Sequence, residues 1–320
     1  MAKTSRLFKS FSKLIFPVIL LIAVALIAAS VWLVHTAAQP PIAAYLVTPE
    51  KYGQLSARGA KVTDENWANR DGSSSRGWLL RGTENAPAVI LLHHYGADRS
   101  HVLDLGIKLN EATNFTILMP DERGHGATPK VKYSSFGGGE ADDVISAIEF
   151  LRGLKTEAQT PLIGQNIGIY GVEMGAIVAL SAAAKDANVK SLVLDSVPEN
   201  SNQVLASAIN FRFPFASSIT SKLAQLGSYP YFYDGSYRRS STCDTAKSLD
   251  SRQVLLLAGT DAPQFQASTA NLAKCFPTTS KVEPKTDLNP SGYSVTNASI
   301  EQAETYERRV IEFFKFSLSN

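Results

Sequence analysis

The chain contains few histidines, few cysteines and few charged residues. Of its 320 residues, five are histidine, and none of these follows His125. Two residues are cysteine, and 19% are charged, with a net charge of +2. Together with 44% hydrophobic residues, this composition excludes an intrinsically disordered chain and indicates a globular one. The nearly balanced charge excludes a polybasic nucleic-acid binder, so we expect no nucleic-acid partner.

A long run without charge lies near the N-terminus. Residues Leu14–Val34 are apolar for about 21 positions, near the length that crosses a bilayer. No Lys, Arg, Asp or Glu occurs between Val34 and Glu50. The basic residues before the run are Lys3, Arg6, Lys9 and Lys13. The positive-inside rule therefore predicts a cytoplasmic segment 1–13, a single transmembrane helix 14–34 in the cell membrane and an extracytoplasmic domain.

A cleaved signal peptide is the alternative interpretation of this run. Thr36-Ala37-Ala38 resembles the small-residue cleavage site, but signal-peptide apolar regions are usually shorter. In both cases the domain is exported, and in that compartment Cys243 and Cys275 can form a disulfide. Two free buried thiols are the alternative, because sequence does not show whether their Cα atoms approach closely enough.

Residues 35–50 read as a Pro-containing linker, and residues 51–320 alternate predicted strands and helices without internal repeats. Strands are predicted at Arg76–Arg81, Ala88–Leu92, Phe115–Met119, Ile167–Tyr170, Ser191–Leu194 and Val254–Leu257. Helices are predicted at His101–Glu111, Glu140–Leu154, Gly175–Lys185, Phe265–Lys274 and Ile300–Phe316. Buried strands that alternate with amphipathic helices predict an α/β fold with a mostly parallel sheet covered on both faces.

A tight turn is predicted at Gly171-Val172-Glu173-Met174-Gly175, between a buried strand and a buried helix. The spacing is that of a nucleophile elbow, in which a nucleophile stands between two small residues. Glycine is required at 171 and 175 because the strand and helix backbones approach closely there. Glu173 occupies the place of the usual serine.

Several motifs in a fixed order resemble the α/β-hydrolase superfamily, in particular membrane-anchored Bem46-like serine hydrolases. The resemblance covers about Gly77 to Phe314. Val89–Gly96 resembles the strand that ends in the His-Gly oxyanion turn, and Pro120–Gly126 resembles the Asp-x-Arg-Gly-His-Gly turn after the next strand. The elbow at residues 171–175 follows, and after it come Val193–Pro198 and Leu255–Asp261, the second of which stands where the strand that carries the acid ends. The resemblance implies an α/β-hydrolase fold with a lid insertion at residues 199–248.

The resemblance also implies a catalytic triad, whose positions are poorly preserved. Such chemistry needs a nucleophile, a histidine base and an orienting carboxylate. Glu173 stands at the nucleophile position, and Tyr293 stands where the histidine is expected. Tyrosine, with a pKa near 10, is a poor general base at pH 7. Asp261 stands at the acid position, two residues after Gly259 where three are commoner. We therefore interpret the chain as a catalytically degenerate serine-hydrolase homologue.

Two other roles are open for Glu173. As a carboxylate nucleophile it would make the chain an active hydrolase of small ester or acyl substrates, although turnover would still need a base-activated water. As a structural anion it would fill the oxyanion hole and accept hydrogen bonds from the backbone amides of Tyr95 and Met174. The second hypothesis explains why a strained elbow is kept without a serine.

The remaining candidate sites have structural explanations. His93, His94, His101 and Asp98 invite a metal interpretation, but their spacing matches no metal motif, and a capped helix start is the alternative. His93 and His125 are expected to tie turns together, and His94 replaces the glycine of the oxyanion turn and would crowd it. The three glycines at 137–139 lack the lysine of a phosphate-binding loop. We expect no metal and no cofactor.

The predicted lid at 199–248 is rich in aromatic residues. They are Phe211, Phe213, Phe215, Tyr229, Tyr231, Phe232, Tyr233 and Tyr237. Such residues can line an apolar ligand pocket, lie against the membrane or cap the core. The partners predicted from sequence are therefore the membrane, through the N-terminal helix, and a small apolar ligand or a protein partner.

Overall fold

A computed structural model describes residues 2–42, 44–52 and 61–319. Residue 1 of the predicted cytoplasmic segment, residue 43 of the predicted linker, and residues 53–60 and 320 of the predicted domain lie outside the described residues. The chain divides into two compact units. The first comprises Met1–Ala38 with Leu205–Gly235, and the second comprises Gln39–Val204 with Ser236–Asn320.

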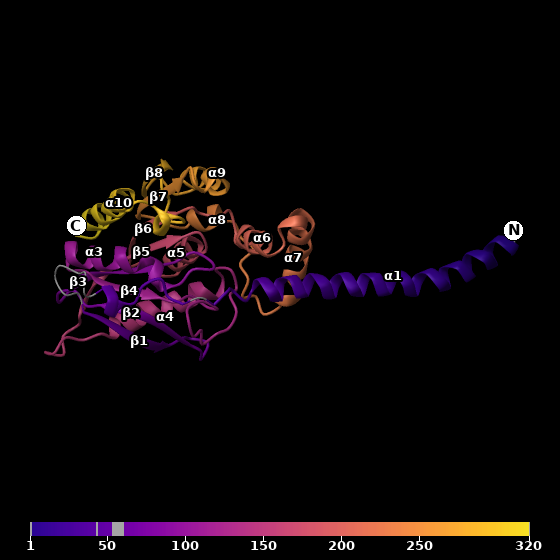
Figure 1. Ribbon diagram of the computed structural model, residues 1–320, viewed down its shortest axis with the longest axis horizontal. Helices are drawn as coiled ribbons and strands as arrows, with labels where there is room; N and C mark the ends of the chain where they lie inside the picture. The colour runs from indigo at the N-terminus through magenta and orange to yellow at the C-terminus, as the bar shows by residue number, and fades with distance from the viewer. Residues whose placement is uncertain (1, 43, 53–60, 320) are drawn as a thin grey trace. The chain divides into compact units, whose positions relative to one another are not determined.

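The second unit contains an eight-stranded sheet in the order β1-β2-β4-β3-β5-β6-β7-β8 (Figure 1). The strands are β1 (Val62–Ala68), β2 (Ser74–Leu80), β3 (Ala86–Leu92), β4 (Thr116–Pro120), β5 (Ile163–Val172), β6 (Val189–Asp195), β7 (Gln253–Gly259) and β8 (Lys281–Leu288). Strand β2 pairs antiparallel with β1 and with β4, and the other pairs are parallel. The predicted mostly parallel sheet is confirmed.

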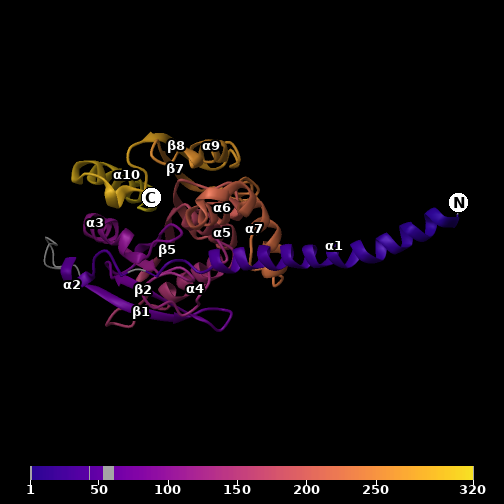
Figure 2. The ribbon, with the colours of Figure 1, turned by 45° about the vertical axis from the view of Figure 1, so that its right-hand side comes forward.

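Helices cover both faces of this sheet (Figure 2). One apolar cluster joins the sheet to α4 (Gly139–Gly153) and α5 (Met174–Lys185), and the other joins it to α3 (Leu103–Thr113) and α10 (Ile300–Leu318). The other helices of this unit are α2 (Pro49–Tyr52), η1 (Arg99–Val102), α8 (Thr242–Ala246), α9 (Pro263–Leu272) and η3 (Val295–Asn297). The central strands are apolar runs because both of their faces are buried.

The two edge strands, β1 and β8, were not predicted from sequence. Strand β1 reads VTDENWA and β8 reads KVEPKTDL, and most side chains of both are exposed or half-buried. An edge strand buries little surface and tolerates charge and proline, so it carries no long apolar run. The sequence signal that identified the central strands is therefore missing here.

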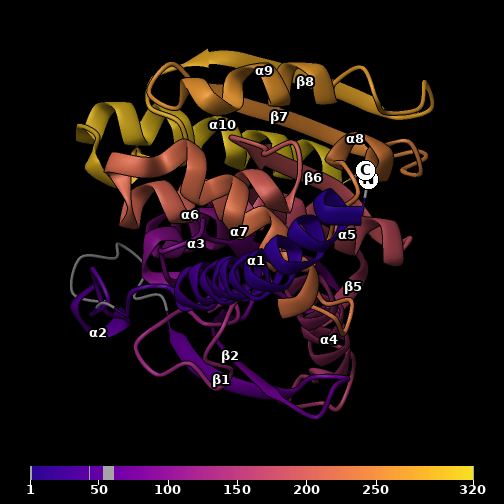
Figure 3. The same ribbon diagram turned by 90° about the vertical axis from the view of Figure 1, so that its right-hand side faces the viewer.

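The first unit pairs the N-terminal helix with part of the predicted lid. Helix α1 (Ala2–Ala37) is longer than the predicted span, and its part Ile15–Ala37 is long and apolar enough to cross a membrane, a test that signal sequences and core helices also pass. Helix α7 (Ser217–Tyr231) lies against α1 (Figure 3). It follows α6 (Ser201–Arg212) and the short η2 (Pro214–Ala216). The predicted lid is thus largely helical.

The two cysteines form a disulfide. Cys243 lies in α8 and Cys275 follows α9, and their Cα atoms are 5.3 Å apart. This decides between the two alternatives that sequence left open.

Candidate functional site

Glu173 stands at the turn between β5 and α5. Its backbone has φ +50° and ψ −108°, a left-handed conformation that is strained for a residue with a side chain. A Cβ atom at Gly171 would lie 2.2 Å from the carbonyl oxygen of Gly175, and one at Gly175 would lie 2.7 Å from that of His93. Both glycines are therefore required by close backbone approach, and the turn has the geometry of a nucleophile elbow.

The Glu173 carboxylate is bound by two backbone amides. Its Oε2 accepts a hydrogen bond from the Tyr95 N–H at 2.9 Å and from the Met174 N–H at 3.1 Å. Met174 is the first residue of α5, so the carboxylate also lies at a helix N-terminus, which favours negative charge. In an acyl-transfer enzyme, two amides placed in this way bind the oxyanion of the intermediate. Here they bind a side chain of the protein itself.

Burial opposes the charge on this carboxylate. Glu173 is 2% exposed, and its burial raises its pKa to about 7, against the lowering effect of the amides of Tyr95 and Met174. The group is therefore partly protonated at neutral pH. No hydrogen bond from a basic side chain to Glu173 is found among the described residues.

Two buried histidines hold the loops beside the elbow. His93 accepts a hydrogen bond on Nε2 from the Glu122 N–H, and His125 accepts one on Nε2 from the Gly96 N–H. Each donates from Nδ1 to a backbone carbonyl, so each is fixed as a neutral tautomer. Burial lowers the pKa of both. The structural part expected of them is confirmed.

His94 and Tyr293 pack together near Glu173. Their ring centroids are 4.7 Å apart, and His94 donates from Nδ1 to the carbonyl of its neighbour Tyr95. Burial lowers the pKa of His94 to about 4, and burial together with the charge of Glu173 raises the pKa of Tyr293 to about 12. Neither side chain is a competent general base at pH 7.

Asp261 binds the loop that carries Tyr293 and not its ring. Its carboxylate accepts hydrogen bonds from the Ser291 N–H and hydroxyl, at 3.1 and 2.9 Å, and from the Ser294 hydroxyl. Burial raises the pKa of Asp261, but these hydrogen bonds outweigh it and hold the pKa below its usual value. The structure therefore brings the Glu173 carboxylate together with the amides of Tyr95 and Met174. The Tyr293 ring lies nearby and contacts His94. The Asp261 carboxylate is bonded to Ser291 and Ser294 instead.

A second aspartate at this edge was missed in the sequence analysis. Asp195, at the end of β6, is fully buried and accepts hydrogen bonds from the Gly292 N–H at 2.9 Å, the Tyr306 hydroxyl at 2.7 Å and the Ser196 hydroxyl at 2.7 Å. The two aspartates thus hold the residues on both sides of Tyr293. A carboxylate at the end of the strand next to the elbow was the sequence signal that could have identified it.

The histidine-rich turn caps a helix. Asp98 is the N-cap of η1 and accepts a hydrogen bond from the Ser100 N–H, and His101 completes a capping box. Within residues 2–42, 44–52 and 61–319, no three metal-ligating side chains gather at one point. The capped helix start, which was the alternative to a metal site, is confirmed.

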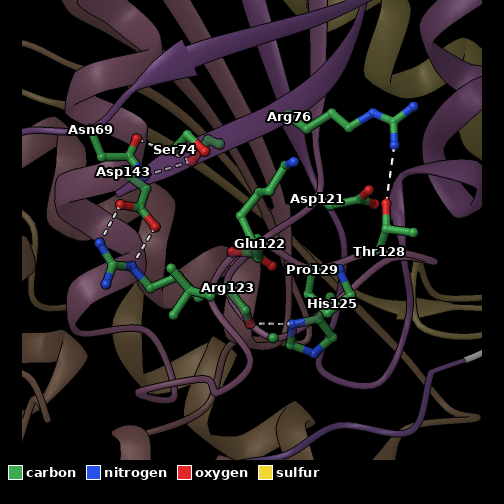
Figure 4. A pocket seen from close by; sticks show the side chains of 14 residues that line it. Asn69, Ser74, Arg76, Asp121, Glu122, Arg123, His125, Thr128, Pro129 and Asp143 are labelled. Carbon is green, nitrogen blue, oxygen red and sulfur yellow. Dashed lines mark hydrogen bonds and ion pairs between the residues drawn. The ribbon is translucent and has the colours of Figure 1, made fainter. Parts of the chain in front are cut away.

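Glu122 is a second buried acid missed from sequence. Neither of its oxygens has a hydrogen-bond partner among the described residues, and burial raises its pKa well above the usual value. It lines a hollow of about 340 Å³, open mouth included, together with Arg76 and Arg123 (Figure 4). Arg123 is paired with Asp143, and Arg76 with Asp64, so these cations are already neutralised. The hollow therefore offers no unpaired arginine to an anionic ligand.

Known proteins resemble the chain in sequence over part of its length. No known protein-family model matches it. It is 26% identical over 124 residues to "Thiohydrolase aneE" of Aspergillus aculeatus, covering 38% of this chain and 37% of that protein. It is 25% identical over 167 residues to "Polyketide transferase grgF" of Penicillium sp, covering 49% and 55%. The chain thus spans between a third and somewhat over half of the length of these relatives.

Solved structures resemble the chain over most of its length. The esterase Pf2001 of Pyrococcus furiosus covers 87% of this chain and 99% of its own, with a TM-score of 0.63 and 20% identity. The α/β hydrolase GrgF of Penicillium sp. covers 81% and 100%, with a TM-score of 0.57 and 16% identity. With the sheet order and the elbow described above, these likenesses identify an α/β-hydrolase-fold protein. Helix α1 is long and apolar enough to span a membrane.

Proposed function

We propose that this protein is a membrane-anchored α/β-hydrolase-fold protein that has lost serine-hydrolase chemistry and acts by binding. The ligand is a small apolar molecule or a protein partner on the extracytoplasmic side. The proposal follows the Bem46-like resemblance for the scaffold and departs from it for the activity, because a fold does not fix a function.

One observation carries the proposal: the Glu173 carboxylate is bound to the amides of Tyr95 and Met174. A substrate carbonyl would need those two N–H groups to stabilise its developing negative charge. An internal carboxylate that holds them blocks this use of the site and repels a second anion. The same residue stands where a serine nucleophile would be, so one substitution removes both functions.

The surroundings of Glu173 also argue against a carboxylate nucleophile. Its Oε2 faces the amides, and the two nearby rings, His94 and Tyr293, are poor bases at neutral pH because their pKa values are about 4 and about 12. A covalent ester formed on Glu173 would need a base-activated water for release. We therefore expect no turnover even from a reactive ester.

The activity test uses the full chain in detergent micelles. We expect no hydrolysis of short-chain p-nitrophenyl esters above that of buffer, and no labelling by a fluorophosphonate probe. The matched variant is Glu173→Gln, which keeps the size of the side chain and removes its charge. Saturable turnover in the native chain that disappears in Glu173→Gln would contradict the proposal and support an active hydrolase built around Glu173.

The binding part of the proposal has its own test. The full chain is mixed with a panel of straight-chain esters and alcohols and measured by native mass spectrometry. We expect a saturable, non-covalent complex from which the bound compound is released chemically unchanged. A chain that binds none of these compounds, or that releases hydrolysed product, would contradict a binding function for apolar ligands.

The anchor and its orientation are tested on intact cells or spheroplasts. The four basic residues Lys3, Arg6, Lys9 and Lys13 predict that protease added outside removes the globular domain and leaves a short protected N-terminal fragment. Protection of the whole domain would reverse the orientation. Recovery of a soluble exported domain that lacks the N-terminal segment would show that this segment is a cleaved signal peptide and not an anchor.

A further inference from the structure

Helix α7 has its small residues inside and large apolar residues outside. The buried positions of this helix are Ser221, Ala224, Gly227 and Ser228. On its exposed side, Ile219 is 66% and Leu226 is 65% exposed, and Tyr229 lies on the same side. A surface helix of a water-soluble protein has the opposite arrangement, because its large apolar side chains face the core.

The small residues allow a close contact with α1. A Cβ atom at Gly227 would lie 2.2 Å from the carbonyl oxygen of Ser30, so only glycine permits this approach. Nearby, His35 Nδ1 lies 3.1 Å from the hydroxyl oxygen of Tyr231, within hydrogen-bond distance. Close backbone approach through small residues is typical of helix pairs in membranes, where large apolar side chains face lipid.

The contact lies in the last part of the apolar span of α1. Ser30, Trp32 and His35 belong to the final third of Ile15–Ala37. The Trp32 ring lies 5.8 Å from the Phe213 ring, just before α7. Earlier in the span, large apolar side chains of α1 are exposed, as a helix surrounded by lipid requires. Helix α7 therefore lies where α1 would leave the hydrocarbon region of a bilayer.

The segment around α7 has the composition of a membrane interface. Lys222 is its only Lys, Arg, Asp or Glu between Phe213 and Tyr233. Phe215 and Tyr233 are almost fully exposed. Tyrosine and tryptophan side chains concentrate at the headgroup level of bilayers, and a lysine can extend its ammonium group to water from there.

We propose that the helical segment 205–235 is a second membrane-contacting element, which lies in the bilayer interface beside the C-terminal end of α1. The partner is a lipid surface. Helix α7 has 15 residues and is therefore about 22 Å long, which is too short to cross the hydrocarbon core. Its exposed apolar side enters the lipid while Lys222 reaches the headgroups. The inference rests on the proposed membrane anchor and extends it.

The test places a fluorescent probe at single positions of the full chain in phosphatidylcholine vesicles. The two native cysteines are disulfide-bonded, so an introduced cysteine is the one free thiol to label. Phe215→Cys and Leu226→Cys, each labelled with a nitrobenzoxadiazole dye, report on the segment. Leu21→Cys reports on α1, and Glu304→Cys on the exposed side of α10 is the aqueous control.

Vesicles that contain brominated lipid are expected to quench the probes at 215, 226 and 21 by at least twofold and to leave the probe at 304 unchanged. Quenching at 21 without quenching at 215 and 226 would overturn the inference and leave the anchor standing. Blue-shifted emission at 215 and 226 without quenching would also overturn it, because protein would then cover the segment. Absence of quenching at all positions would contradict the anchor itself.

Discussion

The carboxylate of Glu173 accepts a hydrogen bond from the backbone amide of Tyr95 at 2.9 Å, although the two residues are 78 positions apart in sequence. Tyr95 follows β3 and Glu173 follows β5, and these strands are neighbours in the sheet. The carboxyl ends of neighbouring parallel strands meet at one edge, so the fold itself creates the pair. In the function that we propose, this pair of amides is an oxyanion hole that an internal carboxylate fills.

Replacing Glu173 by glycine separates the strain of the turn from the binding of the carboxylate. Glycine relieves the strain at φ +50°, roughly 1–2 kcal/mol, but it leaves the buried amides of Tyr95 and Met174 without this acceptor, a loss of roughly 1–3 kcal/mol for each donor. It also loses roughly 0.4–1 kcal/mol through entropy of the unfolded chain. We expect a clearly lower midpoint in urea melts for Glu173→Gly.

Asn85→Gly is the matched control for this measurement. Asn85 also has a positive φ, of 59°, but it lies in an exposed turn without a buried carboxylate. We expect its midpoint to change by much less. A Glu173→Gly midpoint equal to or above that of the native chain would mean that the carboxylate contributes nothing to stability.

The raised pKa of Glu173 makes stability depend on pH. A carboxyl whose pKa rises on folding, here from 4.5 to about 7, binds its proton more tightly in the folded chain. The free energy of unfolding therefore falls as pH rises from 4.5 to 7 and is constant above. The difference between the native chain and Glu173→Gln is expected to fall by about 3 kcal/mol across this window.

Burial and, after it, the charges of Glu140 and Glu173 raise the pKa of Glu122, so part of its effect remains in this difference. Taking the difference removes the buried acids Asp143 and Glu307, whose pKa values are also raised. They titrate in both chains and cancel. Urea melts at intervals between pH 4 and pH 9 measure the effect. A difference that stays constant over this range would show that Glu173 has an ordinary pKa.

The sequence predicted the scaffold of the site better than its chemistry. The elbow, the central strands and the helices on either side follow from apolar periodicity and from the two glycines, which are local signals. Asp195 and Glu122 were not predicted, because what distinguishes them is a pKa raised by burial, and burial depends on neighbours that are distant in sequence. The edge strands β1 and β8 escaped because exposed strands need no apolar run.

The lid shows the same limit. Its aromatic residues left three interpretations open, because composition alone does not say which side of a helix is covered. Gly227 is buried against α1 and Leu226 is exposed, and this difference depends on the packing of α7 against α1, which the sequence of α7 alone does not show. Tyr293 was assigned to the histidine position by resemblance, and its contact with His94 depends on the fold.

Two substitutions at Glu173 and Tyr293 test the proposed loss of the catalytic triad. Glu173→Ser alone is expected to stay inactive on p-nitrophenyl esters, because an unassisted hydroxyl is a weak nucleophile. His94 does not supply the missing base, because a histidine with a pKa of about 4 binds a proton too weakly at neutral pH. Glu173→Ser with Tyr293→His is expected to give slow hydrolysis, since Asp195 and Asp261 already hold the loop that would carry the histidine.

Glu173→Ser with Tyr293→Phe is the control for this pair, because it alters the same two positions without supplying a base. Steady-state rates with a short-chain ester measure all three variants. Activity of the serine variant alone would show that another residue acts as the base, and activity of the phenylalanine control would show that position 293 is not the histidine position.

The disulfide between Cys243 and Cys275 is expected to stabilise the second unit. It closes a loop with a sequence separation of 32, for which chain entropy predicts about 3–4 kcal/mol. The double variant Cys243→Ser, Cys275→Ser should therefore unfold at a lower urea concentration than the oxidised native chain. Reduction of the native chain should shift its midpoint to the same value. Equal midpoints for the oxidised and reduced chains would contradict this expectation.

The most direct measurement of the central claim is a pH titration of the backbone amides of Tyr95 and Met174 by NMR. Selective ¹⁵N labelling of tyrosine and methionine in the full chain, in detergent micelles, leaves few resonances to assign, because the sequence has 11 tyrosines and 3 methionines. If the Glu173 carboxylate fills the oxyanion hole, both amide resonances will shift together with an apparent pKa of about 7, and neither will do so in Glu173→Gln. Amides that do not titrate, or that titrate equally in Glu173→Gln, would contradict the account.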